Sequence, residues 1–175
     1  MLAERTLPFD VVLALRLIRP AGTIVAIGEE LAVAPSQVHA ALARLRRADL
    51  LRPVGRETNT RTLGEFVLYG LRYAFPVRRG PIVTGVPTAY SAPPLAPLID
   101  APDVLVWAAA DAPGAVQGFS VVPLYAGATQ LPLRSPETYR LATLADALRL
   151  GDRRVRGYAR ELISEALGIP KGANG

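Results

Sequence analysis

Polar side chains gather on one face of a helix predicted over residues 36–48. Serine, glutamine, histidine and arginine side chains can bond to the edges of DNA bases or to phosphate oxygens. Apolar residues recur at helical spacing on the other face, at Val38, Ala41, Leu42, Leu45 and Ala48. The polar face consists of Ser36, Gln37, His39, Ala40, Arg44 and Arg47. The segment therefore predicts an amphipathic helix whose outer face is suited to contact DNA.

Each polar side chain has a role that its chemistry suggests. Gln37 can read an adenine with two hydrogen bonds, and Arg44 can read a guanine or hold a phosphate. Ser36, at the start of the helix, suits a phosphate contact. His39 is the only histidine of the chain; we expect a base or phosphate contact there, with a pH-sensing role as the alternative.

The positive charge of the chain is concentrated around this helix. The net charge is +5, and the first 80 residues hold 12 arginines against 7 acidic residues, whereas the remainder is neutral. Arg56 and Arg61 follow the helix and could reach a neighbouring groove or the DNA backbone. A basic helix with a basic loop is typical of DNA-binding proteins. The alternative is a solvated arginine-rich face, above all at Arg46 and Arg47, since the chain has a single lysine.

The surrounding sequence predicts a winged helix-turn-helix. Helices are expected over 8–19 and 24–31, a tight turn at 33–35 precedes the polar helix, and a short β-hairpin is expected over 50–60. The run VAPSQVHAALARLRRADLL resembles the recognition helix of bacterial winged helix-turn-helix regulators of the MarR type. The resemblance covers about residues 8–62. It implies a DNA-binding regulator acting as a dimer.

The rest of the chain is expected to support this unit. A helix is predicted over 61–75, and eleven of the sixteen prolines lie in 76–136. That proline-rich segment is too apolar for a disordered linker. We predict an ordered arm that wraps the domain or a partner subunit. Short strands are expected within it at 82–85, 104–108 and 116–122.

Two helices separated by Gly151 are predicted at the end of the chain, as an antiparallel hairpin. The predicted fold is thus mainly α with a small β component. A DNA-binding domain would occupy 1–62, and 63–175 would make dimer or partner contacts. The apolar stripes of 61–75 and 153–167 are the faces expected for dimerisation, although packing against the first domain is the alternative for 61–75.

The sequence lacks the features of several functional classes. There is no cysteine, a single histidine, no Gly-rich phosphate loop and no nucleophile motif. No catalytic residues, metal ligands or cofactors are therefore predicted, and we expect the protein not to be an enzyme. The loop at 78–90, RRGPIVTGVPTAY, could cradle an anion or be purely structural. Without a leader or a membrane span, a cytoplasmic protein is expected.

The sequence thus predicts a sequence-specific regulator that binds double-stranded DNA as a homodimer. Small arginine-rich regulators of this shape also resemble the DNA-binding antitoxins of toxin–antitoxin operons. In that case the proline-rich arm and the last helices would hold a toxin. The alternative is a winged-helix module that binds other proteins in a larger assembly.

Overall fold

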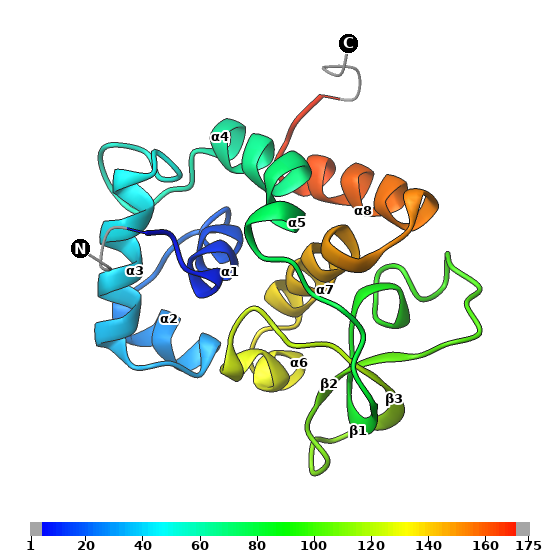
Figure 1. The fold of residues 1–175 in the computed structure, drawn as a ribbon. Helices are drawn as coiled ribbons and strands as arrows, with labels where there is room; N and C mark the ends of the chain where they lie inside the picture. Colours follow the sequence, from blue (N-terminus) through cyan, green and yellow to red (C-terminus); the bar gives the residue numbers. More distant parts are fainter. Residues whose placement is uncertain (1–4, 171–175) are drawn as a thin grey trace.

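The computed structural model describes residues 5–170 and is mainly helical, with one small three-stranded sheet (Figure 1). The helices and strands are α1 Pro8–Arg16, α2 Ile24–Leu31, α3 Pro35–Arg47, α4 Thr60–Glu65, a π-helical turn at Phe66–Gly70, α5 Leu71–Ala74, β1 Ile82–Pro87, β2 Leu105–Ala108, β3 Val116–Ser120, α6 Leu131–Arg134, α7 Pro136–Leu150 and α8 Arg153–Ala166. Short 3₁₀ turns occur at Ala89–Ser91 and Ala126–Gln130. The mainly helical fold with a small β component is confirmed.

The first three helices lie where the sequence predicts them. Thr23 caps α2 by accepting a hydrogen bond from the Ala26 N–H at 3.1 Å, and Pro35 occupies the first turn of α3. α1 ends at Arg16, three residues earlier than expected. The chain then turns before Pro20, whose ring disfavours helical geometry in the residue preceding it.

The hairpin expected over 50–60 is present only as a short antiparallel contact. Leu51 pairs with Thr58, and the Arg52 N–H donates to the Glu57 carbonyl at 2.8 Å. The loop between them is 52–57. Asn59 caps α4 rather than forming the tip of the hairpin.

The helix expected over 61–75 is continuous from α4 to α5, but a π-helical turn interrupts its regular winding. Gly70 lies at the end of that turn. A side chain at position 70 would meet the Phe66 ring of the same helix, at 3.1 Å.

Helix α7 occupies the centre of the molecule. Every residue from Leu141 to Leu148 is buried, and α1, α5 and α8 pack around it (Figure 1). One hydrophobic core extends from α1 to α8 across position 62. The hydrophobic core shows no break at the predicted domain boundary between residues 62 and 63. The two-domain division stays a prediction.

The apolar stripes that we assigned to dimerisation belong to this core. Leu63, Val67 and Leu71 are buried in the helix at 60–74, and Val155, Ala159 and Ile163 are buried in α8. A dimer would therefore have to use other faces of these helices.

The proline-rich segment does not form an extended arm. Its three strands pair in a ring, because β1 is antiparallel to both β2 and β3, which run parallel to each other. The predicted strands are present, with bounds that differ by one to two residues. In Figure 1 this sheet lies at the lower right, on the far side of α7 from α3.

Backbone groups of the loop at 78–90 are engaged in this sheet. The Gly80 N–H donates to Ser120, and the Thr88 N–H donates to Leu105. The Thr88 hydroxyl donates to buried Asp146 at 2.8 Å. These hydrogen bonds support a structural role for the loop at 78–90 and do not support its role as an anion cradle.

Glycine makes the closure of so small a sheet possible. A Cβ atom at Gly85 would lie 2.0 Å from the Trp107 carbonyl oxygen, and one at Gly118 would lie 2.6 Å from that of Val104. Both obstacles are backbone atoms, which cannot turn aside as a flexible side chain can. The strands can approach to this distance only because both positions lack a side chain.

We predict that Gly85→Ala lowers the free energy of unfolding by about 2 kcal/mol or more, because the added methyl group must displace backbone. Gly157→Ala is the matched control: a Cβ at this helical position would meet no atom within 4 Å. That change should raise the free energy of unfolding by about 0.5–1 kcal/mol. Urea unfolding followed by circular dichroism measures both, and equal stability of Gly85→Ala and wild type would contradict the closed sheet.

Candidate nucleic-acid interface

Helix α3 is amphipathic in the way that its sequence predicts. Val38, Ala41, Leu42 and Leu45 are buried against the core. The outer face is exposed at Ser36, Gln37, His39, Ala40, Arg46 and Arg47. In Figure 1, α3 lies at the left edge of the molecule, and no other helix or strand covers its outer side. The helix can therefore contact a large ligand along most of its length.

The leading end of α3 carries uncharged polar groups. The Gln37 side-chain oxygen accepts a hydrogen bond from the Ala34 N–H at 3.1 Å, which satisfies a backbone donor at the start of the helix. This occupies one acceptor position of the amide and leaves its NH₂ group for another partner. Two-bond reading of adenine by Gln37 would use the second lone pair of the same oxygen.

Arg44 does not belong to the outer face. Its guanidinium donates two hydrogen bonds to the Asp10 carboxylate, from Nε at 2.8 Å and from Nη2 at 2.7 Å. The Asp10 side chain is fully buried, and the Arg44 side chain is only 13% exposed. Donation to Asp10 raises the pKa of the Arg44 guanidinium. Arg44 therefore joins α3 to α1, and we withdraw it from the residues expected to read DNA.

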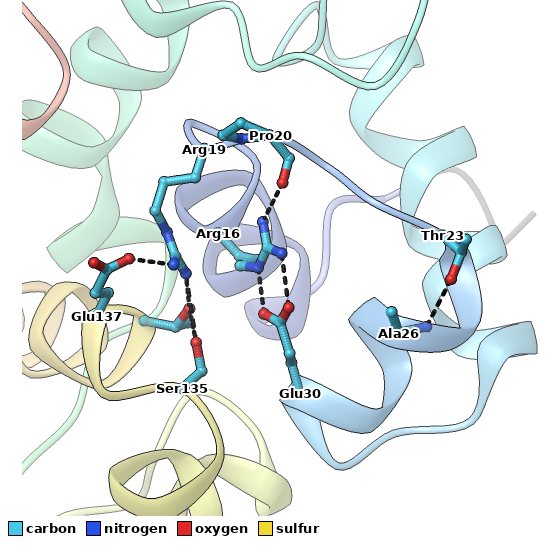
Figure 2. A network of polar contacts seen from close by, with 9 residues as sticks. Arg16, Arg19, Pro20, Thr23, Ala26, Glu30, Ser135 and Glu137 are labelled. Carbon is cyan, nitrogen blue, oxygen red and sulfur yellow. Dashed lines mark hydrogen bonds and ion pairs between the residues drawn. The ribbon is translucent and has the colours of Figure 1, made fainter.

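Helix α1 is in turn fixed to its neighbours by two arginines (Figure 2). Arg16 donates to both carboxylate oxygens of Glu30 on α2, at 2.5 and 2.8 Å, and to the Pro20 carbonyl at 3.0 Å. The hydrogen bonds from Arg16 hold the pKa of Glu30 below its usual value. Arg19 forms an ion pair with Glu137 at the start of α7 and donates to Thr138 at 3.0 Å. These contacts tie α1 to α2 and α7, and Asp10 extends the connection to α3.

Ser135 precedes α7 and belongs to the same network. Although serine often caps a helix, its hydroxyl makes no capping hydrogen bond to the helix backbone. The hydroxyl instead lies 2.8 Å from that of Thr138 and accepts from Arg19 at 3.4 Å. The residue connects α7 to α1 instead of closing its own helix.

The loop at 52–57 is attached to the end of α3. Arg46 donates to the Gly55 carbonyl at 3.0 Å, so this arginine is more than part of a solvated face. At the base of the loop, the buried Thr58 hydroxyl donates to the Ala14 carbonyl of α1 at 2.6 Å. Arg56 is half-buried on this loop. The loop and α3 thus form one continuous surface.

Arg61 lies beside this surface, in the first turn of α4. Its side chain is 88% exposed, and Glu65 lies 3.5 Å away on the next turn. The Thr62 hydroxyl donates to the Asp49 carbonyl at 2.6 Å, which places the start of α4 next to the end of α3. Solvent weakens an exposed ion pair of this kind, so Arg61 can exchange Glu65 for a phosphate.

A second segment, which was not predicted from the sequence, braces α1 and the end of α2. Arg134 of α6 donates to the Glu29 carbonyl at 2.7 Å, and the Tyr125 ring packs against Phe9 at a centroid distance of 5.1 Å. A side chain at Gly127 would lie 2.7 Å from the Leu31 carbonyl oxygen. The glycine spacing alone could have indicated a close approach here, but not its partner.

The predicted site residues therefore separate into groups. Those on the outer surface of α3 and its neighbours are Ser36, Gln37, His39, Ala40, Arg47, Arg56 and Arg61. Arg44 is diverted into an internal ion pair. Within residues 5–170, no group of three His, Cys, Asp or Glu side chains could hold a metal ion. No helix in that range has both the length and the apolar character needed to cross a bilayer.

Comparison of the chain with protein-family models, curated proteins and solved structures finds no match. The resemblance to MarR-type regulators thus stays a prediction from the sequence run at 33–51. The features that bear on function are therefore those of the surface formed by α3, the loop at 52–57 and the start of α4.

We predict that Arg44→Ala lowers the free energy of unfolding by about 3–5 kcal/mol, because it leaves the buried Asp10 carboxylate without its charged partner. Arg140→Ala, at an exposed arginine of α7, is the control and should change stability by less than about 0.5 kcal/mol. Chemical unfolding of both variants tests this. Equal stabilities would show that Arg44 is not a structural residue.

Proposed function

We propose that the protein binds double-stranded DNA through α3 and acts as a sequence-specific transcriptional regulator with a winged helix-turn-helix domain. One observation carries the proposal. The outer face of α3 is exposed along its length and continues into an arginine-bearing loop, to which Arg46 ties it at 3.0 Å. An α-helix with such a face fits the major groove of B-DNA.

The two halves of α3 would have different tasks. Its leading end, at Ser36, Gln37, His39 and Ala40, carries uncharged groups that suit base edges. Its other end adjoins Arg47, Arg56 and Arg61, whose charges suit phosphates. Base contacts would supply sequence preference, and phosphate contacts would supply most of the salt-dependent affinity.

A regulator of this kind gains specificity by binding as two copies. Two α3 helices related by a two-fold axis would reach half-sites about 34 Å apart on one side of the DNA. The operator would then be an inverted repeat. Repression of the protein's own promoter is the simplest regulatory outcome and includes the antitoxin-type arrangement.

The Gln37→Glu variant tests the groove contact without disturbing the helix start. A glutamate at position 37 keeps an oxygen that can accept from the Ala34 N–H, and its charge is favourable near a helix N-terminus. In the groove the same carboxylate would be repelled by phosphates. We expect affinity for a duplex selected from a random pool to fall at least tenfold, about 1.4–3 kcal/mol, with no loss of folding stability.

The matched control is Gln117→Glu, the same chemical change at an exposed position of β3. It should leave affinity within about twofold of wild type. Fluorescence anisotropy measures both variants. If Gln37→Glu bound the selected duplex as wild type does, α3 would not be the reading helix. Absence of any enriched duplex would favour the protein-binding alternative.

Salt titration tests the phosphate contacts. Arg61→Ala and Arg56→Ala should each weaken binding to selected and scrambled duplexes alike. Each should also reduce the slope of log affinity against log salt concentration by about one unit. Arg78→Ala, an exposed arginine between α5 and β1, serves as the control of equal charge loss. If all three variants had the same slope, charge alone would explain binding, and the 52–61 surface would have no special role.

A further inference from the structure

Helix α8 has an outer face that the core does not use. Its inner stripe, Val155, Ala159, Ile163 and Leu167, is buried against α7. On the opposite side of the helix lie the exposed residues Arg154, Tyr158, Glu161 and Glu165. These recur at the spacing of a single straight face, so the outer surface of α8 is as regular as its inner one.

The charges on this face run against the helix dipole. Arg153 and Arg154 lie in the first turn, where backbone N–H groups already give a positive end, and Glu165 lies in the last turn. The first turn holds no acid, and the last turn holds no base. Each such charge is unfavourable relative to the reverse arrangement. The Asp152 carboxylate, which accepts from the Val155 N–H at 2.9 Å, offsets part of this cost at the start of the helix but not at its end.

Pairing with neighbouring residues along the helix does not offset the rest of the cost. The positions three and four residues after Arg154 are Gly157 and Tyr158, and Glu161 stands four residues before a like charge, Glu165. Within residues 5–170, none of Arg153, Arg154, Glu161 and Glu165 forms an ion pair. Among the described residues, neither charged end of the face has an ion-pair partner.

Gly157 creates a hollow at the middle of the face. A Cβ atom there would meet nothing within 4 Å, so neither packing nor backbone conformation requires glycine. Glycine inside a helix is less favourable than alanine. The hollow is shallow and open to solvent, and it is lined by Arg153, Arg154, Gly157, Tyr158 and Glu161. A missing side chain on an exposed helix face allows another helix to approach closely.

We infer that this face binds a second copy of the same chain, with the two α8 helices antiparallel and crossing at a point between Gly157 and Tyr158. A two-fold axis at that point places Arg154 of each copy opposite Glu161 of the other, because the two positions lie equally far from the crossing. Tyr158 of each copy then enters the hollow above Gly157 of the other. The antiparallel arrangement also sets each arginine-bearing helix start beside the negative end of the neighbouring helix.

The charge pattern of this face fits a second copy of the chain better than it fits a different protein. A two-fold interface brings the same patch together from both sides, so it must be self-complementary. A face that is positive at one end, negative at the other and hollow in the middle meets that condition. This inference rests on the proposed function. Binding to two half-sites requires two copies of the chain, and the outer face of α8 would hold the two copies together.

Charge reversal gives a decisive test in solution. Sedimentation velocity is measured without DNA at low salt, over about a 100-fold range of concentration on the order of micromolar. Wild type should shift from monomer to dimer across this range. Arg154→Glu and Glu161→Arg should each raise the dimer dissociation constant at least about tenfold, because each creates two like-charge contacts. The double variant in one chain should restore it to within about threefold of wild type.

Two further variants separate the interface from folding. Arg154→Glu places an acid at a helix start, so its thermal stability should not fall, and weaker dimerisation then cannot reflect unfolding. Gly157→Leu should fold as wild type, because the position is open, yet remain monomeric. Arg140→Glu, an exposed arginine of α7, should dimerise as wild type.

The inference is overturned if wild type stays monomeric, if the single reversals dimerise as wild type, or if the double variant fails to recover. Measuring affinity for a duplex with a single half-site distinguishes failure of the dimer inference from failure of the proposed DNA-binding function. Loss of dimerisation alone leaves affinity for a single half-site unchanged. Failure of DNA binding leaves the sedimentation results unchanged.

Discussion

The ion pair between Asp10 and Arg44 is the interaction on which the candidate interface depends. A carboxylate with no solvent exposure is costly unless its charge and lone pairs are satisfied. Asp10 accepts two hydrogen bonds from Arg44 and one from the Leu7 N–H at 2.8 Å. The same carboxylate thus fixes the first turn of α1 and the last turn of α3. The outer face of α3 points away from the core because its inner face is held in this way.

A second buried carboxylate organises the other half of the molecule. Asp146 of α7 accepts hydrogen bonds from Trp107 at 2.6 Å and from Thr88 at 2.8 Å, and it pairs with Arg149 at 2.7 Å. Burial raises the pKa of Asp146, and Arg149 opposes that effect. These bonds seat the closed sheet on α7, on the side away from α3. The outer face of α3 consequently remains uncovered in a chain that packs around a single core.

Local patterns predicted the helices well because their causes are local. Apolar spacing located α3 and α8. Thr23 and Asp152 cap α2 and α8 as their residue types favour, with Asp152 accepting from the Val155 N–H at 2.9 Å. The three strands were found for the same reason. The closure of the three strands into a ring was not predicted. It depends on pairing between segments far apart in the sequence and on the absence of a side chain at Gly85.

Arg44 shows where sequence reasoning on the site fails. A polar position on an amphipathic helix is ordinarily solvent-facing, yet the partner of Arg44 lies 34 residues away on another helix. The sequence around Asp10 does not reveal this pairing, because an acidic residue in the first turn of a helix is also common at the surface. The other predicted contact residues do lie on the outer surface, which is where periodicity alone would put them.

Photocrosslinking tests the central claim, that α3 enters DNA, most directly. A benzophenone-bearing amino acid is placed at Ala40 on the outer face of α3 or at Ile82, which is 63% exposed on β1. Each protein is then irradiated with a duplex selected from a random pool. We predict crosslinks from position 40 to bases inside the selected site and none from position 82. A bound duplex that crosslinks from position 82 and not from position 40 would contradict the account.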